Sequence, residues 1–161
     1  MSLGDMFLKV EGAKLGPIKG EAQDEKHKDE IDVLSWSWGM RAQTAMGAAG
    51  PSGKATLREL NIVKRVDSAS TGLMSAMRNN DLIKKAVLTV RKSGGSPLEY
   101  CKIPIEKGRI TALDVESGAS GAQTELTETL SLAFQKISIE YVPQGSDGHP
   151  RGSMLFETEI A

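Results

Sequence analysis

The sequence predicts a mainly β fold, in which two antiparallel sheets form a small barrel or sandwich with one short helix. Apolar and polar residues alternate along most segments, which is typical of half-buried strands. Glycine-rich turns separate these segments, and the strand–helix–strand rhythm of a parallel sheet does not occur. With 161 residues the chain can form one domain, residues 1–161, with a sizeable core.

Several segments have the alternation of strands. They are residues 7–10, 31–40, 55–64, 85–92, 98–105, 109–115, 126–141 and, as a possible closing strand, 154–156. A turn-rich stretch and a charged loop over 21–30, expected to be solvated, separate the first two. A hairpin turn over 93–97 joins two later ones. The spacing of strands and turns therefore favours an antiparallel arrangement.

The segment 31–40 contains both tryptophans of the chain, two residues apart. Because side chains alternate along a strand, Trp36 and Trp38 share one face with Leu34. The indole rings bury large areas, so we expect this face to pack into the core. The opposite face carries small side chains, which are Val33, Ser35, Ser37 and Gly39.

The long segment 126–141 changes phase part of the way along. Its apolar residues keep one phase as far as Phe134 and the opposite phase from Ile137 onward. A slip at Gln135 and Lys136 is the signature of a β-bulge. Such a bulge would bend a strand that is long enough to serve two sheets.

Two glycine-rich stretches are expected to be flexible loops. One covers residues 118–121. The other covers residues 47–53, and its turn-forming residues are Gly47, Gly50, Pro51 and Gly53.

One helix is predicted, over residues 71–79. Ser70 suits the N-cap position, and Leu73, Met74 and Met77 lie at helical spacing on one face. We interpret this face as packing on a sheet rather than as a groove for a partner.

Composition argues against several classes of partner. A formal net charge of −1 gives no reason to expect binding to nucleic acid or to an acidic membrane. No apolar run suits membrane insertion, and the N-terminus lacks the pattern of a signal peptide, so release from the cell would need another route. Cys101, the single cysteine, is expected to be a buried structural thiol.

The residues do not predict an enzyme. Neither His27 nor His149 has a second ligand at metal-binding spacing, and His27 is interpreted as part of the solvated loop. The stretch before Lys54 fails as a phosphate-binding loop, because Ala48 and Ala55 stand where glycine and a hydroxyl residue are required. We therefore expect no catalytic residue, no metal and no cofactor.

Several segments resemble, in the same order, the haemolysin-coregulated proteins (Hcp), the tube-forming subunits of bacterial type VI secretion systems. The strongest match is residues 27–40, which join a charged loop to I-D-V-L and W-S-W-G. The other matches are residues 6–10, 16–21, 85–94, 99–100, 141–144 and 147–148, so the resemblance spans nearly the whole chain. The tail departs from it, because many members have a glycine-tryptophan pair where this chain has G-S-M-L-F at 152–156.

The resemblance implies a fold like that of phage tail-tube proteins and a homohexameric ring. Such rings stack into the inner tube of a contractile machine, beneath a valine-glycine-repeat spike and within contractile sheath proteins. Effector proteins travel in the lumen, and the subunit is cytoplasmic before firing and secreted afterwards. By the same resemblance, Ser37 is a candidate for contact with effectors on the lumen wall. An ordinary outer sheet face is the alternative.

The loop with Gly47, Gly50, Pro51 and Gly53 is a candidate for contacts between stacked rings, and an ordinary surface loop is the alternative. The residues also leave a second function open. A monomeric β-sandwich could bind a ligand or a peptide along a sheet edge.

Overall fold

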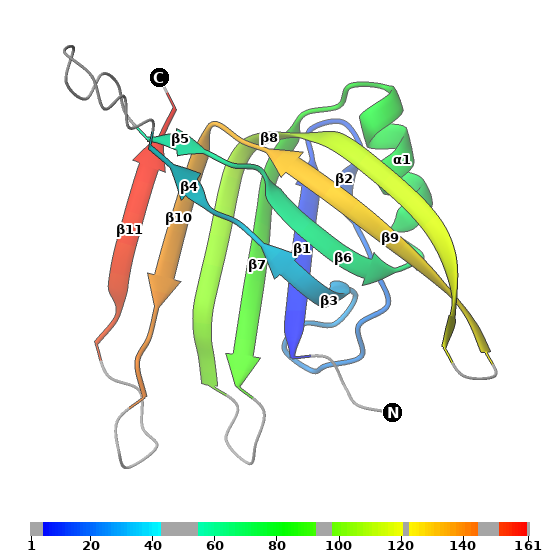
Figure 1. Ribbon diagram of the computed structural model, residues 1–161, viewed down its shortest axis with the longest axis horizontal. Coiled ribbons are helices and arrows are strands. Elements are labelled where there is room, and N and C mark those ends of the chain that lie inside the picture. The colour runs from blue at the N-terminus through cyan, green and yellow to red at the C-terminus, as the bar shows by residue number, and fades with distance from the viewer. Residues whose placement is uncertain (1–4, 43–54, 93–97, 121–122, 145–151, 161) are drawn as a thin grey trace.

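The computed structural model describes residues 5–42, 55–92, 98–120, 123–144 and 152–160. Strands predominate in this part of the chain, together with one helix, α1 (Ser70–Arg78) (Figure 1). The strands are β1 (Met6–Gly12), β2 (Gly16–Ile18), β3 (Ile31–Ser37), β4 (Met40–Arg41), β5 (Thr56–Leu57), β6 (Leu60–Arg65), β7 (Ile83–Lys92), β8 (Leu98–Ser120), β9 (Gln123–Ala133), β10 (Lys136–Tyr141) and β11 (Met154–Glu159).

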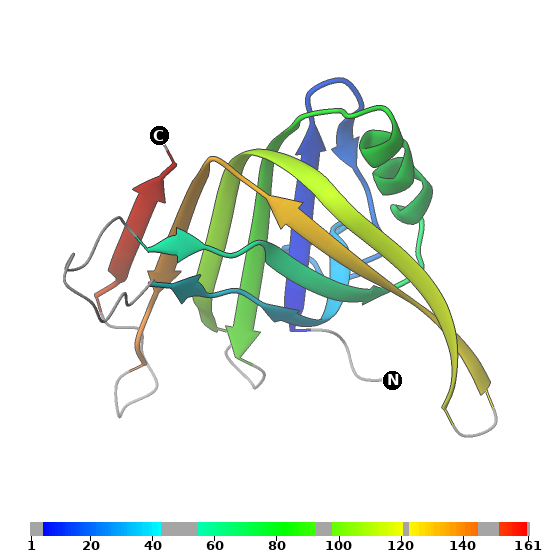
Figure 2. The same ribbon diagram turned by 45° about the horizontal axis from the view of Figure 1, so that its top comes forward.

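A closed barrel organises these strands. Six of them pair in the order β8, β7, β1, β3, β6 and β9, and β9 pairs again with β8, so the sheet closes on itself. Every pairing in the barrel is antiparallel. Figures 1 and 2 show β3, β6 and β9 crossing in front of β1, β7 and the first half of β8. The predicted fold class is confirmed.

The sheet continues beyond the barrel on the side of β8. Strand β10 pairs with the first half of β8, and β11 pairs with β10, which confirms the predicted closing strand and extends it to Glu159. Strand β2 is added to β1, and β4 and β5 form a small separate sheet. Fully buried apolar side chains fill the space between the crossing layers, namely Leu8, Ile31, Leu60, Ile62, Leu88, Ile105, Leu130 and Leu132.

Strand β8 is continuous over 23 residues. The prediction of separate strands over 98–105 and 109–115 is therefore wrong, and so is the predicted loop as far as residue 120. The chain bends at Lys107, whose φ is 53°, and a Cβ at Gly108 would lie 2.7 Å from the backbone oxygen of Ala133. Glycine permits this close approach, so β8 can pair with β7 and β10 before the bend and with β9 after it.

The predicted strand over 126–141 is divided into β9 and β10. The change of phase was located correctly, since Leu132 and Phe134 before it and Ile137 after it are all buried. The predicted bulge is wrong, because the chain leaves the ladder at Gln135, whose N–H donates to the carbonyls of Glu106 and Lys107. This interruption lets both strands pair with β8, one on each half.

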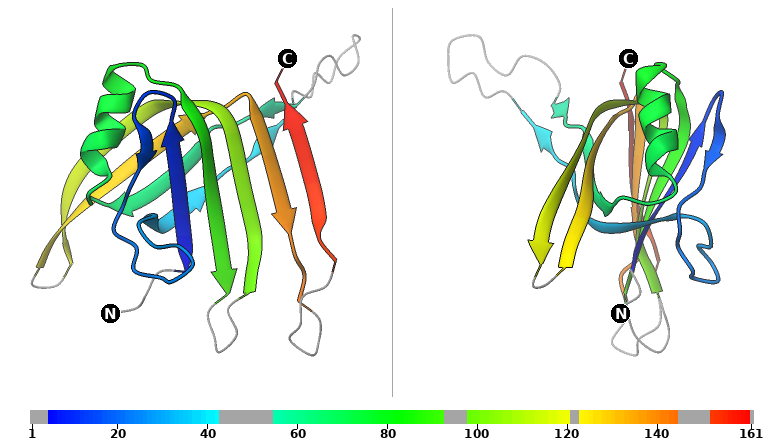
Figure 3. Two further views of the ribbon diagram at one scale, coloured as in Figure 1. Left: turned by 180° about the vertical axis from the view of Figure 1, so that it is seen from behind. Right: turned by 90° about the vertical axis from the view of Figure 1, so that its right-hand side faces the viewer.

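Helix α1 begins at Ser70, one residue earlier than predicted, so Ser70 is its first residue and not its N-cap. Ala69 occupies the N-cap position, and its N–H donates to a carboxylate oxygen of Asp67 at 3.0 Å. Ser70, Leu73 and Ala76 form the buried face. The predicted face of Leu73, Met74 and Met77 is wrong for the two methionines, which are each 38% exposed. Figure 3 shows α1 between the β8–β9 ribbon and β1. No helix within the described ranges is long and apolar enough to span a bilayer.

Candidate functional surface

A bulge in β3 decides which side chains face the core. Val33 pairs with Lys64, and Ser35 pairs with the adjacent Val63, so Leu34 is an extra residue on β3. The bulge brings Val33 to the same side as Trp36, and Val33 is only 4% exposed. The expected position of Val33 on the face of Ser37 is therefore wrong. A regular alternation of letters does not reveal such a bulge.

Trp36 and Trp38 lie on the core side of β3 after the bulge. Both are partly buried and pack against the core cluster, and Trp36 lies opposite the fully buried Ile62. The indole nitrogen of Trp38 is buried and has no hydrogen-bond partner among the described residues.

Ser37 is exposed on the outward side of β3 and belongs to a row of polar side chains. Ser37 lies opposite Asn61 of β6, and Asn61 lies opposite Ser131 of β9. Directly opposed residues on neighbouring strands point to the same face, so the three share one surface. The Ser131 hydroxyl donates a hydrogen bond to the side-chain oxygen of Asn61 at 2.7 Å, which holds these two side chains of the row together.

A second row runs beside the first across the same strands. It consists of Ser35, Val63, Thr129 and Asp114. Together the two rows form a surface of small, mostly uncharged side chains on β3, β6, β9 and β8, which we call the polar face. Sequence analysis identified only the residues of β3, because the others join them through strand register, which local alternation cannot supply.

Beneath the polar face lies a buried ionic cluster that joins the barrel to α1. The Lys64 ammonium lies 2.7 Å from Glu128 and 2.9 Å from Asp67, and Lys64 and Glu128 are fully buried. The Ser70 hydroxyl donates to Glu128 at 2.7 Å. The second carboxylate oxygen of Glu128 has no hydrogen-bond partner among the described residues. The cluster ties the first turn of the helix to β6 and β9.

His27 holds the charged loop against the barrel. It is 7% exposed, and its ring stacks on Phe7 at 4.5 Å between centroids. Nδ1 lies 3.0 Å from Glu30, and Nε2 lies 2.7 Å from Glu99 of β8. Each ring nitrogen therefore lies within hydrogen-bond distance of a carboxylate. The interpretation of His27 as a solvated residue is wrong, and its partner 72 residues away carried no local signal.

A second ionic contact joins the same loop to β7. Arg91 forms an ion pair with Asp24 at 2.9 Å, and its guanidinium carbon lies 5.1 Å from the centre of the Phe7 ring. Phe7 therefore has His27 stacked on it and a guanidinium over its ring. Attraction of a cation to an aromatic ring is added to the ion pair at this point.

Acid is expected to weaken these contacts of the loop. Arg91 holds the pKa of Asp24 below its usual value through a hydrogen bond. Burial raises the pKa of Glu99, but the hydrogen bonds and charges of His27 and Lys102 outweigh it, so that the pKa is lowered. Such carboxylates contribute stability that is fully present above their ordinary pKa, about 4, and that is lost as the pH falls through the lowered value. Asp24→Asn should therefore flatten the acid dependence of unfolding, measured by circular dichroism. An acid dependence equal to that of the wild type would contradict this.

The remaining candidate residues are Cys101, His149 and those of the glycine-rich loop. Cys101 is partly buried on β8, and burial raises the pKa of its thiol. No group of three or more His, Cys, Asp or Glu side chains in the described ranges is arranged to hold a metal ion. His149 and the candidate loop residues Gly47, Gly50, Pro51 and Gly53 lie outside the described residues.

Comparison with known proteins identifies the class to which this protein belongs. The family model described as "Type VI secretion system effector, Hcp" matches residues 7–141. A curated relative, Protein hcp1 of Pseudomonas aeruginosa, is 37% identical over 151 residues, which are 92% of this chain and 89% of the relative. The fold and these matches define a β-barrel component of the type VI secretion system.

Solved structures agree with this class. Hcp1 from Salmonella typhimurium has a TM-score of 0.76 at 30% identity, covering 97% of this chain and 94% of its own. A type VI secretion system effector from Yersinia pestis has a TM-score of 0.74 at 29% identity, covering 97% and 100%. The chain belongs to the Hcp family. This is a family of structural, secreted tube proteins rather than of enzymes.

Proposed function

We propose that this protein forms homohexameric rings, that the rings stack into the inner tube of a type VI secretion system, and that effectors travel in the lumen. The proposed partners are further copies of the chain, a valine-glycine-repeat spike protein, contractile sheath proteins and the effectors. The subunit is cytoplasmic before firing and secreted afterwards. Membership of the Hcp family supports this proposal.

The polar face is the observation that carries the proposal. A lumen wall has to contact cargo without binding it so tightly that delivery fails. Exposed Ser35 and Ser37, with partly exposed Asn61, Ser131 and Thr129 beside them, offer hydrogen bonds but few apolar anchors. We assign this face to the lumen.

Native mass spectrometry tests the assembly. At micromolar concentration we expect a species of about six times the chain mass of 17.3 kDa. Detection of monomer alone at micromolar concentrations would contradict the proposed ring and therefore also the proposed tube. Stacking is then read from negatively stained electron micrographs of the same preparation. The role of the loop over 47–53 in stacking stays a prediction.

Substitution of Ser37 tests the lumen assignment. Ser37→Gln adds a longer side chain to an exposed position and is expected to leave the ring intact, because surface substitutions usually change stability by less than about 0.5 kcal/mol. It should reduce the amount of a co-expressed effector that is pulled down with the ring. Lys9→Gln, at an exposed position of β1 outside the polar face, is the matched control. Equal retention by both variants would show that Ser37 does not contact cargo.

A monomeric peptide-binding module is the alternative function. The edge position of β11 favours it, because β11 pairs only with β10 in the described sheet and an unpaired edge can accept an added strand. Binding of extended peptides by a persistently monomeric protein would support this alternative. A stable hexamer that binds no such peptide would exclude it.

A further inference from the structure

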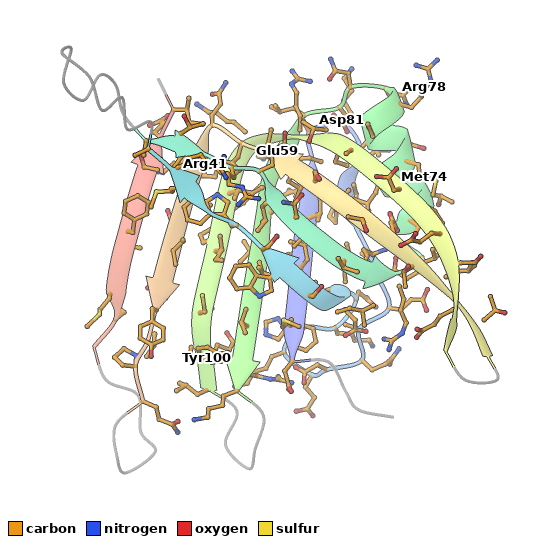
Figure 4. All side chains as sticks on the ribbon, in the orientation of Figure 1. Arg41, Glu59, Met74, Arg78, Asp81 and Tyr100 are labelled. Atoms are coloured by element: carbon orange, nitrogen blue, oxygen red, sulfur yellow. The ribbon has the colours of Figure 1, made fainter. Side chains whose placement is uncertain are left out.

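A hollow of about 300 Å³ lies where β7 ends, β8 begins and β10 ends. The described residues that line it are Lys92, Leu98, Tyr100, Tyr141, Val142 and Gln144. Figure 4 places Tyr100 below the level at which β3 and β4 cross in front of these strands, so the second layer leaves this end of the sheet uncovered. We call the space the tyrosine hollow.

Strand register explains why these side chains share one side of the sheet. Val90 lies opposite Cys101 and Lys92 lies opposite Leu98, and between these pairs Tyr100 is an extra residue on β8. Val90 is 7% exposed and faces the core, and Lys92 follows it on the same side of β7. The bulge turns the adjacent Tyr100 and Cys101 to that side, because both pack against the core cluster.

Two tyrosine rings give the hollow aromatic walls. Tyr141 lies opposite Cys101, so it faces the same side of the sheet as Tyr100. Tyr100 is partly buried, whereas Tyr141 is 46% exposed. Leu98 and Val142 add aliphatic surface, and the N–H of Val142 donates to the carbonyl of Tyr100 at 2.8 Å, which joins the two walls. A hollow of this size is at the lower limit for small-molecule sites and suits a group of about one ring.

Lys92 is the one charged residue among the described residues that line the tyrosine hollow. Its ammonium donates to the side-chain oxygen of Gln144 at 3.0 Å and forms no ion pair with a residue that the structure describes. The neighbouring charged side chains face the opposite side of the sheet in two cross-strand pairs, namely Arg91 with Glu99 and Lys102 with Glu140. The hollow therefore combines one positive charge with aromatic and aliphatic walls.

We propose that the tyrosine hollow binds an aromatic carboxylate, with its ring against Tyr100 and Tyr141 and its carboxylate at the Lys92 ammonium. Aromatic rings attract one another in offset or edge-to-face arrangements, and here two rings come from neighbouring strands. A single ammonium at the rim matches one carboxylate and disfavours a cationic ligand. A free aromatic acid and the C-terminal aromatic residue of a peptide share this chemistry. The site lies within one chain and is independent of the proposed ring.

Ligand titrations of the full-length protein, followed by ligand-observed NMR, test the site. The probe is N-acetyl-L-phenylalanine, and we expect saturable binding. N-acetyl-L-phenylalanine amide lacks the carboxylate and should bind about fivefold more weakly, since an exposed ion pair contributes up to about this factor. N-acetylglycine lacks the ring and should show no saturable binding at the same concentrations.

Two lysine variants measure the role of charge. Lys92→Gln should raise the dissociation constant of N-acetyl-L-phenylalanine about fivefold and leave that of the amide unchanged. Lys85→Gln is the matched control, because Lys85 is an exposed lysine of the same strand that lies opposite Glu106 on the other side of the sheet. It should leave both dissociation constants unchanged.

A third variant measures the role of the aromatic wall. Tyr141→Ala should weaken binding of the acid and of the amide alike, by about tenfold. Its melting temperature shows whether the subunit remains folded, and a folded subunit is expected because Tyr141 is exposed. Absence of saturable binding to the wild type, or equal effects of Lys92→Gln and Lys85→Gln, would overturn the inference and leave the proposed ring untouched.

A final titration distinguishes the two sources of the ligand. A hexapeptide that ends in phenylalanine with a free carboxylate is compared with N-acetyl-L-phenylalanine. Tighter binding of the hexapeptide would assign the site to the C-terminus of a polypeptide, whereas equal or weaker binding would assign it to a free aromatic acid. Either result supports the site, provided that Lys92→Gln weakens the binding.

Discussion

Replacing Glu128 by alanine is expected to destabilise the subunit by about 3–5 kcal/mol. The substitution leaves the fully buried ammonium of Lys64 with Asp67 as its remaining carboxylate, although Glu128 is the nearer of the two at 2.7 Å. It also removes the nearer acceptor of the Ser70 hydroxyl, so the first turn of α1 loses its hydrogen bond to β9. Urea unfolding followed by circular dichroism measures the change.

Two control variants separate the effect of burial from the effect of charge on the stability of the subunit. Glu125→Ala breaks the ion pair with Arg65 on the same two strands, where both side chains are about half exposed, and should cost less than about 1 kcal/mol. The double variant Lys64→Met/Glu128→Leu removes both buried charges and should recover most of the stability, since buried pairs are often replaced by apolar groups at little cost. If the double variant were as unstable as Glu128→Ala, the loss of stability would come from altered packing and not from the unpaired charge of Lys64.

Trp36→Ala is expected to destabilise the subunit by about 3–5 kcal/mol, the usual cost of truncating a large aromatic side chain in a core. Trp36 packs against the core cluster and lies opposite the fully buried Ile62 of β6, so the substitution would open a cavity beside the core. The change is measured by urea unfolding with circular dichroism as the signal, because the substitution removes one of two tryptophan fluorophores.

The neighbouring residue is the control for this substitution. Ser37→Ala changes an exposed side chain on the opposite side of β3 and should alter stability by less than about 0.5 kcal/mol. If Trp36→Ala cost no more than Ser37→Ala, the prediction that Trp36 anchors the core would be wrong.

The mainly β fold and most strand positions could be predicted from the sequence, because alternation is imposed locally by burial of one face. The same pattern located the change of phase near Gln135. What failed depends on contacts between distant residues. Gly108 looked like a strand end because glycine is common in turns. In the structure it lies inside β8, where the backbone of Ala133 approaches.

Predictions about individual side chains failed for the same reason. The residues next to His27 in the sequence are charged and predicted a solvated position. In the structure its ring stacks on Phe7 and contacts Glu99, so the side chain is nearly buried. The bulge at Leu34 moved Val33 into the core without any glycine or proline to mark it. For the polar face, the strand carrying Ser37 was predictable, but its neighbours on β6 and β9 follow only from the register of the sheet.

The continuous β8 has a mechanical consequence. A load that pulls the two crossing layers apart along this strand acts on its ladders in shear, so many hydrogen bonds to β7, β10 and β9 must fail together. A hairpin peeled from its end would instead lose its bonds one at a time. Two separate strands joined by a loop would concentrate the same load on the linker. A 23-residue strand shared by both layers spreads the force over both halves of the barrel. The proposed role as a tube subunit that a contracting sheath propels would require this resistance.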